Sequence, residues 1–129
     1  MRRWYLDTSA ALKLLIEESE SAALAAAIDA TEPDLVACFL LETELRRAVH
    51  RDPSINQSDV SGFLEGVGLY EIPVSLFQEA GLLGGRNLRS LDALHLAAAI
   101  RIGVEHVVTY DIRMAEAARD LGLSVSSPS

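Results

Sequence analysis

Short apolar runs alternate with helix-forming segments along almost the whole chain, and this alternation constrains the fold more than any other feature. The predicted strands cover residues 4–6, 35–38, 69–74, 104–110 and 123–125. The predicted helices cover residues 10–16, 19–30, 40–51, 54–68, 75–83, 90–103 and 111–121. Pro73 predicts that its strand lies at an edge of the sheet or ends there. The pattern predicts a three-layer α/β/α domain whose central sheet is mostly parallel and has four to five strands.

Local signals indicate where two of the helices begin. Thr8 and Ser9 are favoured residue types at the N-cap of the first helix, and Ser90 is favoured at the N-cap of the helix over residues 90–103. Gly103 is expected to end that longer helix. Its apolar spacing predicts a buried face made of Leu91, Leu94, His95, Ala98 and Ile102.

The composition suits one folded domain over residues 1–129. Half of the residues are hydrophobic, which excludes a disordered chain, and no apolar run approaches the roughly 20 residues of a membrane span. Met1-Arg2-Arg3 resembles the start of a signal peptide, but Asp7 interrupts the apolar stretch that would have to follow. The single cysteine, Cys38, excludes a disulfide framework, and its apolar neighbours indicate an inert buried thiol. We therefore expect a cytoplasmic protein with no membrane association.

The net charge of −8 limits how this chain can bind nucleic acid. Lysine and arginine supply most of the non-specific affinity of proteins for duplexes, so an acidic protein needs a local arginine cluster or a bound metal ion. Arg86 and Arg89 precede the helix over residues 90–103 and are candidates for contacts with phosphate groups or with surface acids. The acidic surface also suits a basic protein partner.

Three acidic residues fall where predicted elements begin or end, and a fourth lies inside a separate predicted helix. Asp7 and Asp111 each follow a predicted strand, and ligands of parallel sheets gather at the carboxyl ends of the strands. Asp92 lies in the first turn of a helix, where the helix dipole alone also favours an acid. Glu44 lies inside the helix over residues 40–51, away from its apolar face. These acids can therefore converge on one site.

Such a convergence requires a counter-charge. Several carboxylates in a low-dielectric site cannot all stay ionised unless a cation is present or protons are taken up. Ligation by oxygen alone favours Mg²⁺ or Mn²⁺ over zinc. A site of this kind performs phosphoryl chemistry, because the ion activates a water and binds phosphate oxygens.

Four segments of the chain carry a family resemblance. They are Tyr5-Leu6-Asp7-Thr8-Ser9-Ala10, Glu44-Leu45-Arg46-Arg47-Ala48, Leu91-Asp92-Ala93-Leu94-His95-Leu96-Ala97 and Thr109-Tyr110-Asp111-Ile112-Arg113-Met114. In this order they resemble the PIN-domain family and, more narrowly, the VapC-type toxins of bacterial toxin–antitoxin pairs. One departure is Cys38-Phe39, where relatives often carry serines.

The resemblance implies an Mg²⁺-dependent endoribonuclease, with Mn²⁺ as the alternative ion, that hydrolyses RNA with a metal-activated water. Asp7 and Asp92 match the positions that hold the metal, and Asp111 with Glu44 would complete the cluster or orient the attacking water. Thr109 matches a small polar position that supports the site. The resemblance also implies a cognate antitoxin protein and a homodimer. The loop before Asp92 is expected to open near the site, which favours Arg86 and Arg89 as RNA contacts.

Two neighbours of these acids have competing interpretations. His95 follows Asp92 by three residues on the same predicted helix and could act as a base, but we interpret it as a partly buried core histidine. Glu42 is a rival to Glu44, but residues two apart face different sides of a helix. The Leu-Arg-Arg-Ala that follows Glu44 favours Glu44.

Other functions fit the residues less well. A phospho-acceptor domain needs an adjacent acid pair and a strand-end lysine, whereas the only lysine, Lys13, lies in the first predicted helix. A haloacid-type phosphohydrolase needs a second acid two residues after Asp7, where Ser9 stands. A catalytically silent PIN-like module that binds RNA or protein remains the alternative, and the presence of all four acids favours an enzyme.

Overall fold

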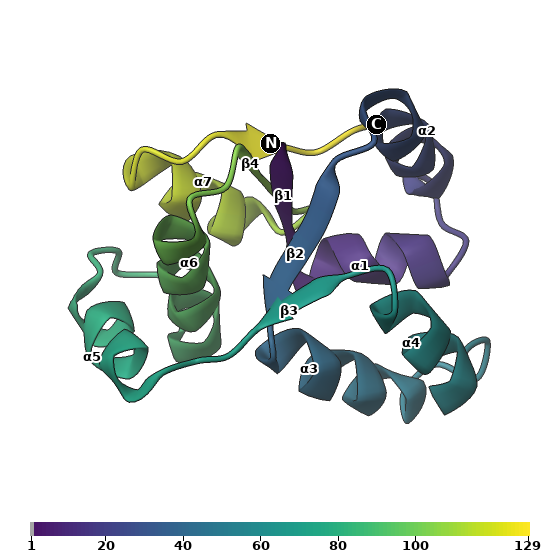
Figure 1. The fold of residues 1–129 in the computed structure, drawn as a ribbon, viewed down its shortest axis with the longest axis horizontal. Coiled ribbons are helices and arrows are strands. Elements are labelled where there is room, and N and C mark those ends of the chain that lie inside the picture. Colours follow the sequence, from purple (N-terminus) through teal and green to yellow (C-terminus); the bar gives the residue numbers. More distant parts are fainter. Residues whose placement is uncertain (1) are drawn as a thin grey trace.

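The computed structural model describes residues 2–129 as a parallel sheet with helices on both faces (Figure 1). The strands are β1 (Arg3–Leu6), β2 (Asp34–Cys38), β3 (Gly68–Tyr70), β4 (His106–Val108) and β5 (Val125–Ser126). All neighbouring strands pair in parallel, in the order β3-β2-β1-β4-β5. The predicted three-layer architecture and its mostly parallel sheet are confirmed, and the predicted edge strand is β3.

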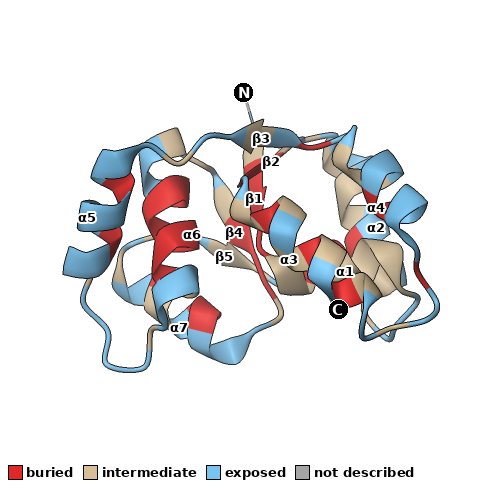
Figure 2. Cartoon of the chain, turned by 90° about the horizontal axis from the view of Figure 1, so that it is seen from below, coloured by how far each residue is buried: buried red, intermediate tan, exposed pale blue. Residues whose placement is uncertain are grey.

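The helices form a layer on each side of the sheet. They are α1 (Thr8–Leu15), α2 (Ser21–Thr31), α3 (Leu40–Val49), α4 (Gln57–Leu64), α5 (Val74–Leu82), α6 (Ser90–Ile102) and α7 (Ile112–Asp120). Helices α1 to α4 lie on one side, and α5 to α7 lie on the other (Figures 1 and 2). No helix within residues 2–129 has both the length and the apolar composition that crossing a membrane requires.

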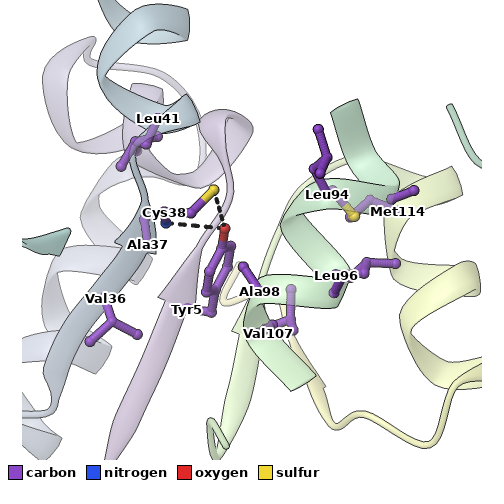
Figure 3. Packing of buried hydrophobic residues seen from close by; sticks show 14 of the residues in the cluster. Tyr5, Val36, Ala37, Cys38, Leu41, Leu94, Leu96, Ala98, Val107 and Met114 are labelled. Atoms are coloured by element: carbon purple, nitrogen blue, oxygen red, sulfur yellow. Dashed lines mark hydrogen bonds between the residues drawn. The ribbon is translucent and has the colours of Figure 1, made fainter. Parts of the chain in front are cut away.

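Strand β1 divides its side chains between the two layers. Trp4 and Leu6 pack with Ala10 of α1 and Leu24 of α2. Tyr5 points the other way, because successive side chains of a strand face opposite sides of a sheet. Its ring lies between the sheet and α6, beside Ala98 (Figure 3). The central strand therefore joins both halves of the core.

Strands β3 and β4 are shorter than the sequence predicts, and their pairing partners explain why. The predicted strand over residues 69–74 ends at Tyr70, whose partner Cys38 is the last residue of β2. The predicted strand over residues 104–110 is paired only from His106 to Val108, because β1 ends opposite Val108. A strand ends where its neighbour stops offering hydrogen bonds, and apolar composition does not report that point.

The helix starts also differ from the predictions. Asp7, and neither Thr8 nor Ser9, is the N-cap of α1, and its side chain accepts a hydrogen bond from the Ala10 amide. Ser90 lies inside the first turn of α6, and Arg89 occupies the N-cap without a side-chain cap bond. Asp7 starts the helix because it directly follows the last residue of β1 and its carboxylate can accept that amide.

Helix α4 begins later than predicted. A capping box fixes its start, in which the Asn56 side chain accepts from the Asp59 amide and the Asp59 carboxylate accepts from the Asn56 amide. The helix runs to Leu64 rather than over residues 54–68. The Asn-x-x-Asp spacing is visible in the sequence and could have placed this boundary.

Helix α6 is buried over nearly its full circumference from Ala93 to Ala99 (Figure 2). It packs against α5 as well as against β2, so no narrow apolar stripe is needed. Leu91, predicted as part of the buried face, is 49% exposed, because it lies in the first turn ahead of the buried segment. The helix that carries Asp92 and His95 is therefore the central element of its layer.

We expect Leu96→Ala to lower the free energy of unfolding by about 2–5 kcal/mol, because Leu96 is fully buried in α6. Chemical denaturation measures this loss. Ile100→Ala on the same helix is the matched control, since Ile100 is 45% exposed and should lose far less. Equal losses for the two variants would contradict this description of the core.

Candidate active site

The carboxyl ends of β1 and β4 lie side by side and set the position of Asp7. Leu6 is paired with Val108, and the Asp7 amide continues the ladder by donating to the Val108 carbonyl at 3.3 Å. The residue after each strand therefore faces the other, which brings Thr109 against Asp7. The Thr109 hydroxyl donates to Asp7 Oδ2 at 2.5 Å.

The other oxygen of Asp7 is also held. Asp7 Oδ1 accepts from the Ser9 hydroxyl at 2.7 Å and from the Ala10 amide at 2.9 Å. The side chain is only 4% exposed. Burial raises the pKa of Asp7 above its ordinary value, although the bonds from Thr109, Ser9 and Ala10 partly oppose this effect. The site thus holds a carboxylate that a nearby positive charge would stabilise.

Thr109 joins Asp7 to the start of α7. Its hydroxyl accepts from the Asp111 amide at 3.1 Å while it donates to Asp7. Asp111 is the N-cap of α7, where Oδ1 accepts from the amides of Arg113 and Met114 at 2.9 and 3.3 Å. The hydrogen bonds found for this carboxylate within residues 2–129 all use Oδ1, so Oδ2 is left for a ligand. Asp111 is exposed, so a ligand can reach it.

The negative charges of two other acids act on Asp92. It lies in the first turn of α6 and is half-buried. Burial raises the pKa of Asp92, and the negative charges of Asp111 and Glu44 raise it further, while His95 and Arg89 act in the opposite direction. Three of the predicted acids therefore share one electrostatic environment, although they come from α3, α6 and the start of α7.

Glu44 is held by a residue that the sequence placed in the core. Its Oε1 lies 2.5 Å from His95 Nε2. Burial alone would raise the pKa of Glu44, but the hydrogen bond and positive charge of His95 bring it below its ordinary value. Its rival Glu42 instead forms an ion pair with Arg46 at 3.1 Å. The structure thus turns Glu44, and not Glu42, toward α6.

His95 is buried, as interpreted from the sequence, with 2% of its surface exposed. Burial lowers the pKa of His95, but Cys38 and Glu44 outweigh that effect and raise it to about 10. The link to Glu44 was missed because 51 positions separate the two residues, and no local pattern reports such a contact.

Cys38 is buried as predicted, but its surroundings are not wholly apolar. Its Sγ lies 3.2 Å from the Tyr5 hydroxyl and 3.7 Å from His95 Nδ1. Burial raises the pKa of the Cys38 thiol, but the hydrogen bond and charge of His95 bring it below its ordinary value. The prediction of an apolar environment was wrong in this respect, because the imidazole arrives from α6 on a distant part of the chain.

Arg86 and Arg89 lie on the exposed loop between α5 and α6. Arg89 is close enough to Asp92 to oppose the rise in the pKa of that carboxyl. Arg86 lines a surface pocket with Asn87 and with Arg113 of α7. Neither Arg86 nor Arg89 has a carboxylate within ion-pair distance in residues 2–129, so both remain available to an anion.

The four acids fit a hard divalent cation in donor type and in charge. Their oxygens are the ligands such ions prefer, and a cation would oppose the repulsion that raises the pKa of Asp92. Within residues 2–129, however, no three acidic, histidine or cysteine side chains already surround one point. Binding an ion therefore requires these carboxylates to turn toward it.

The fold and these motifs match one family. A model of the PIN domain matches residues 4–120, so the chain belongs to the PIN-domain family. Within that family it is a VapC-type protein. It is 37% identical over 127 residues to Ribonuclease VapC46 of Mycobacterium tuberculosis, with 97% of both chains covered. It is 39% identical over 129 residues to Ribonuclease VapC35 of the same species, with 96% of both covered.

Solved structures show the same fold at low sequence identity. VapBC2 from Rickettsia felis, bound to a promoter DNA fragment, matches with a TM-score of 0.73 at 16% identity and covers 98% of this chain and 99% of that chain. The sarcin-ricin loop cleaving toxin VapC20 of Mycobacterium tuberculosis matches with a TM-score of 0.71 at 15% identity and covers 88% and 94%. These matches agree with the resemblance read from the four sequence segments.

We expect Thr109→Val to raise the pKa of Asp7 further, because the variant loses the hydroxyl that stabilises the ionised carboxylate. Carboxyl NMR titration measures this shift. Unfolding free energy should fall by about 1–3 kcal/mol, since a buried acceptor and the Asp111 amide lose their partner. Thr109→Ser keeps the hydroxyl and is the matched control. An unchanged Asp7 titration in the valine variant would contradict the role given to Thr109.

Proposed function

We propose that this chain is a metal-dependent endoribonuclease, the toxin of a toxin–antitoxin pair, which hydrolyses RNA at the site formed by Asp7, Glu44, Asp92 and Asp111. The observation that carries the proposal is that these acids are linked: Asp111 and Glu44 act electrostatically on Asp92, and the Thr109 hydroxyl bonds both the buried Asp7 carboxylate and the Asp111 amide. The family match and the names of the similar ribonucleases support the same activity.

The surroundings of each residue indicate its role in the proposed reaction. Asp7 and Asp92 would hold Mg²⁺, or Mn²⁺ as the alternative, because both are acids whose pKa is raised in the absence of a cation. When bound, the ion supplies positive charge that activates water and stabilises the charge developing on phosphate oxygens. Thr109 fixes the rotamer of Asp7. Asp111, exposed and with one oxygen unused, would orient the attacking water together with Glu44.

The RNA would be bound by local positive charge, since the chain as a whole carries −8. Arg89 is the N-cap of α6, within one turn of Asp92, and Arg86 lies in the loop that leads into this helix. Arginine suits phosphate because its planar group donates two parallel hydrogen bonds. Sequence-specific recognition of RNA usually targets unpaired or looped segments, so we propose a looped RNA as substrate. An RNA substrate also places the activity in the cytoplasm.

An antitoxin protein is the proposed partner. The structures similar to this chain include VapBC2 of Rickettsia felis and a toxin–antitoxin complex from Klebsiella pneumoniae, which matches with a TM-score of 0.70. A basic segment of the antitoxin would complement the acidic surface of this chain. The proposal also includes a homodimer, which rests on the family resemblance.

A catalytically silent module that binds RNA or protein is the second candidate. The observation in its favour is that no three ligating side chains within residues 2–129 already gather around one point. The action of Asp111 and Glu44 on Asp92 favours the enzyme, because carboxylates that repel one another in a half-buried site suit a bound cation.

The test compares the wild type with Asp7→Asn and Asp92→Asn on total bacterial RNA in the presence of Mg²⁺ or Mn²⁺, with mapping of the new RNA ends. We expect each variant to lose at least about 100-fold in cleavage rate, because loss of a metal ligand exceeds the loss caused by its supporting residues. Mn²⁺ titration calorimetry should show weaker binding by both. Asp29→Asn, an exposed acid on α2, is the matched control and should cleave normally.

Each alternative has a distinct result. Wild-type cleavage rates in both variants would contradict the assigned site. A wild type that binds RNA but neither cleaves it nor binds Mn²⁺ would support the silent module.

A further inference from the structure

A string of buried polar groups leads from the sheet to the candidate active site. Tyr5 of β1 and Cys38 of β2 are fully buried, and His95 of α6 is nearly so. Tyr5 OH lies 2.7 Å from His95 Nδ1, and His95 Nε2 lies 2.5 Å from Glu44 Oε1. Figure 3 shows the inner end of the string, where the Tyr5 hydroxyl meets the backbone and thiol of Cys38. The string ends on the half-buried Glu44.

The chemistry of these groups fixes how the imidazole is held. An ionised carboxylate only accepts hydrogen bonds, so His95 Nε2 must carry the proton that it shares with Glu44. The opposite nitrogen, Nδ1, faces the Tyr5 hydroxyl. That hydroxyl in turn accepts from the Cys38 amide at 3.2 Å, so it is tied to the main chain of β2. Both edges of the ring are therefore bound.

The link also joins elements that the sheet separates. Glu44 lies on α3 and His95 lies on α6, and these helices are in different layers (Figure 1). His95 follows Asp92 by three residues on α6, so the two side chains share one side of that helix. Holding Glu44 against His95 thus fixes Glu44 relative to Asp92.

The apolar surroundings of position 95 on α6 do not by themselves call for an imidazole. His95 is flanked by the buried residues Leu94 and Leu96, and burying polar groups costs free energy unless each finds a partner. Core packing alone therefore gives no reason for an imidazole here. The hydrogen bond from His95 Nε2 to Glu44 does give a reason for an imidazole at this position.

We propose that His95 is a positioning residue that holds the Glu44 carboxylate in the orientation needed for RNA cleavage, and that Tyr5 positions His95. This inference rests on the proposed function, since it assumes that Glu44 belongs to the active site. It assigns to His95 a role other than general base, because its Nε2 is already committed to Glu44. In this arrangement the main chain of β2 holds the Tyr5 hydroxyl, Tyr5 holds His95, and His95 holds Glu44.

The test compares His95→Leu with His95→Gln. Leucine removes the donor, and glutamine can place an amide N–H near the position of Nε2. We expect His95→Leu to lower kcat by about 10–100-fold with little change in the KM for RNA, as supporting residues of metal sites typically do. We expect His95→Gln to recover most of that loss. Thermal unfolding is recorded for each variant to separate activity from stability.

A double-mutant cycle tests whether His95 acts through Glu44. In the Glu44→Gln background, His95→Leu should cause little further loss of kcat, because the group that it positions has already been altered. Additive losses would overturn the proposal, as would equal loss of kcat by His95→Gln and His95→Leu.

A third variant keeps the test decisive if His95→Leu does not fold. Tyr5→Phe removes one oxygen and leaves the imidazole in place, and it should lower kcat in the same direction but by less. Full activity in Tyr5→Phe would then overturn the proposal. The proposed function fails separately, since its failure is seen as a wild type that does not cleave, or as full cleavage by Glu44→Gln.

Discussion

The parallel pairing of β1 with β4 is the contact on which the rest of the site depends. It ends at Leu6 opposite Val108, so the next residues on both strands, Asp7 and Thr109, meet at the carboxyl edge of the sheet. A shift of one residue in this register would turn Tyr5 away from α6 and separate Asp7 from its hydroxyl partner. The buried side chains of β1 hold the register, because Trp4 and Leu6 face one layer and Tyr5 faces the other.

The acids at this edge differ in their burial, their hydrogen bonds and the charges around them. Asp7 is buried and held by three donors, whereas Asp92 is half-buried and repelled by Asp111 and Glu44. The pKa of Glu44 lies below its ordinary value, because His95 lies against it. A site in which Asp7 and Asp92 are destabilised as anions while Glu44 is ionised is suited to a divalent cation. A cation would offset both the burial and the repulsion that raise the pKa of Asp92, and this is the physical basis of the proposed metal dependence.

Much of the fold follows from local sequence, and much of the site's support does not. The alternation of apolar and helical segments was enough to predict the order of strands and helices along the chain, because the central strands β1, β2 and β4 are mostly buried and carry apolar runs. The ends of β3 and β4 depend on their partners, which composition does not report. The acids themselves stand in recognisable segments, three of them at element boundaries and Glu44 inside α3. The bond between Glu44 and His95 joins distant segments across two layers, so only the folded chain reveals it.

The central claim is that the acids at the carboxyl edge of the sheet gather around one divalent cation. Crystals of the wild type soaked in Mn²⁺ test this most directly, because anomalous scattering at the manganese edge locates the ion without reference to activity. The account predicts one strong peak within ligand distance of both Asp7 and Asp92, with their side chains turned toward it. No ion at this edge, or an ion bound only elsewhere on the protein, would contradict it.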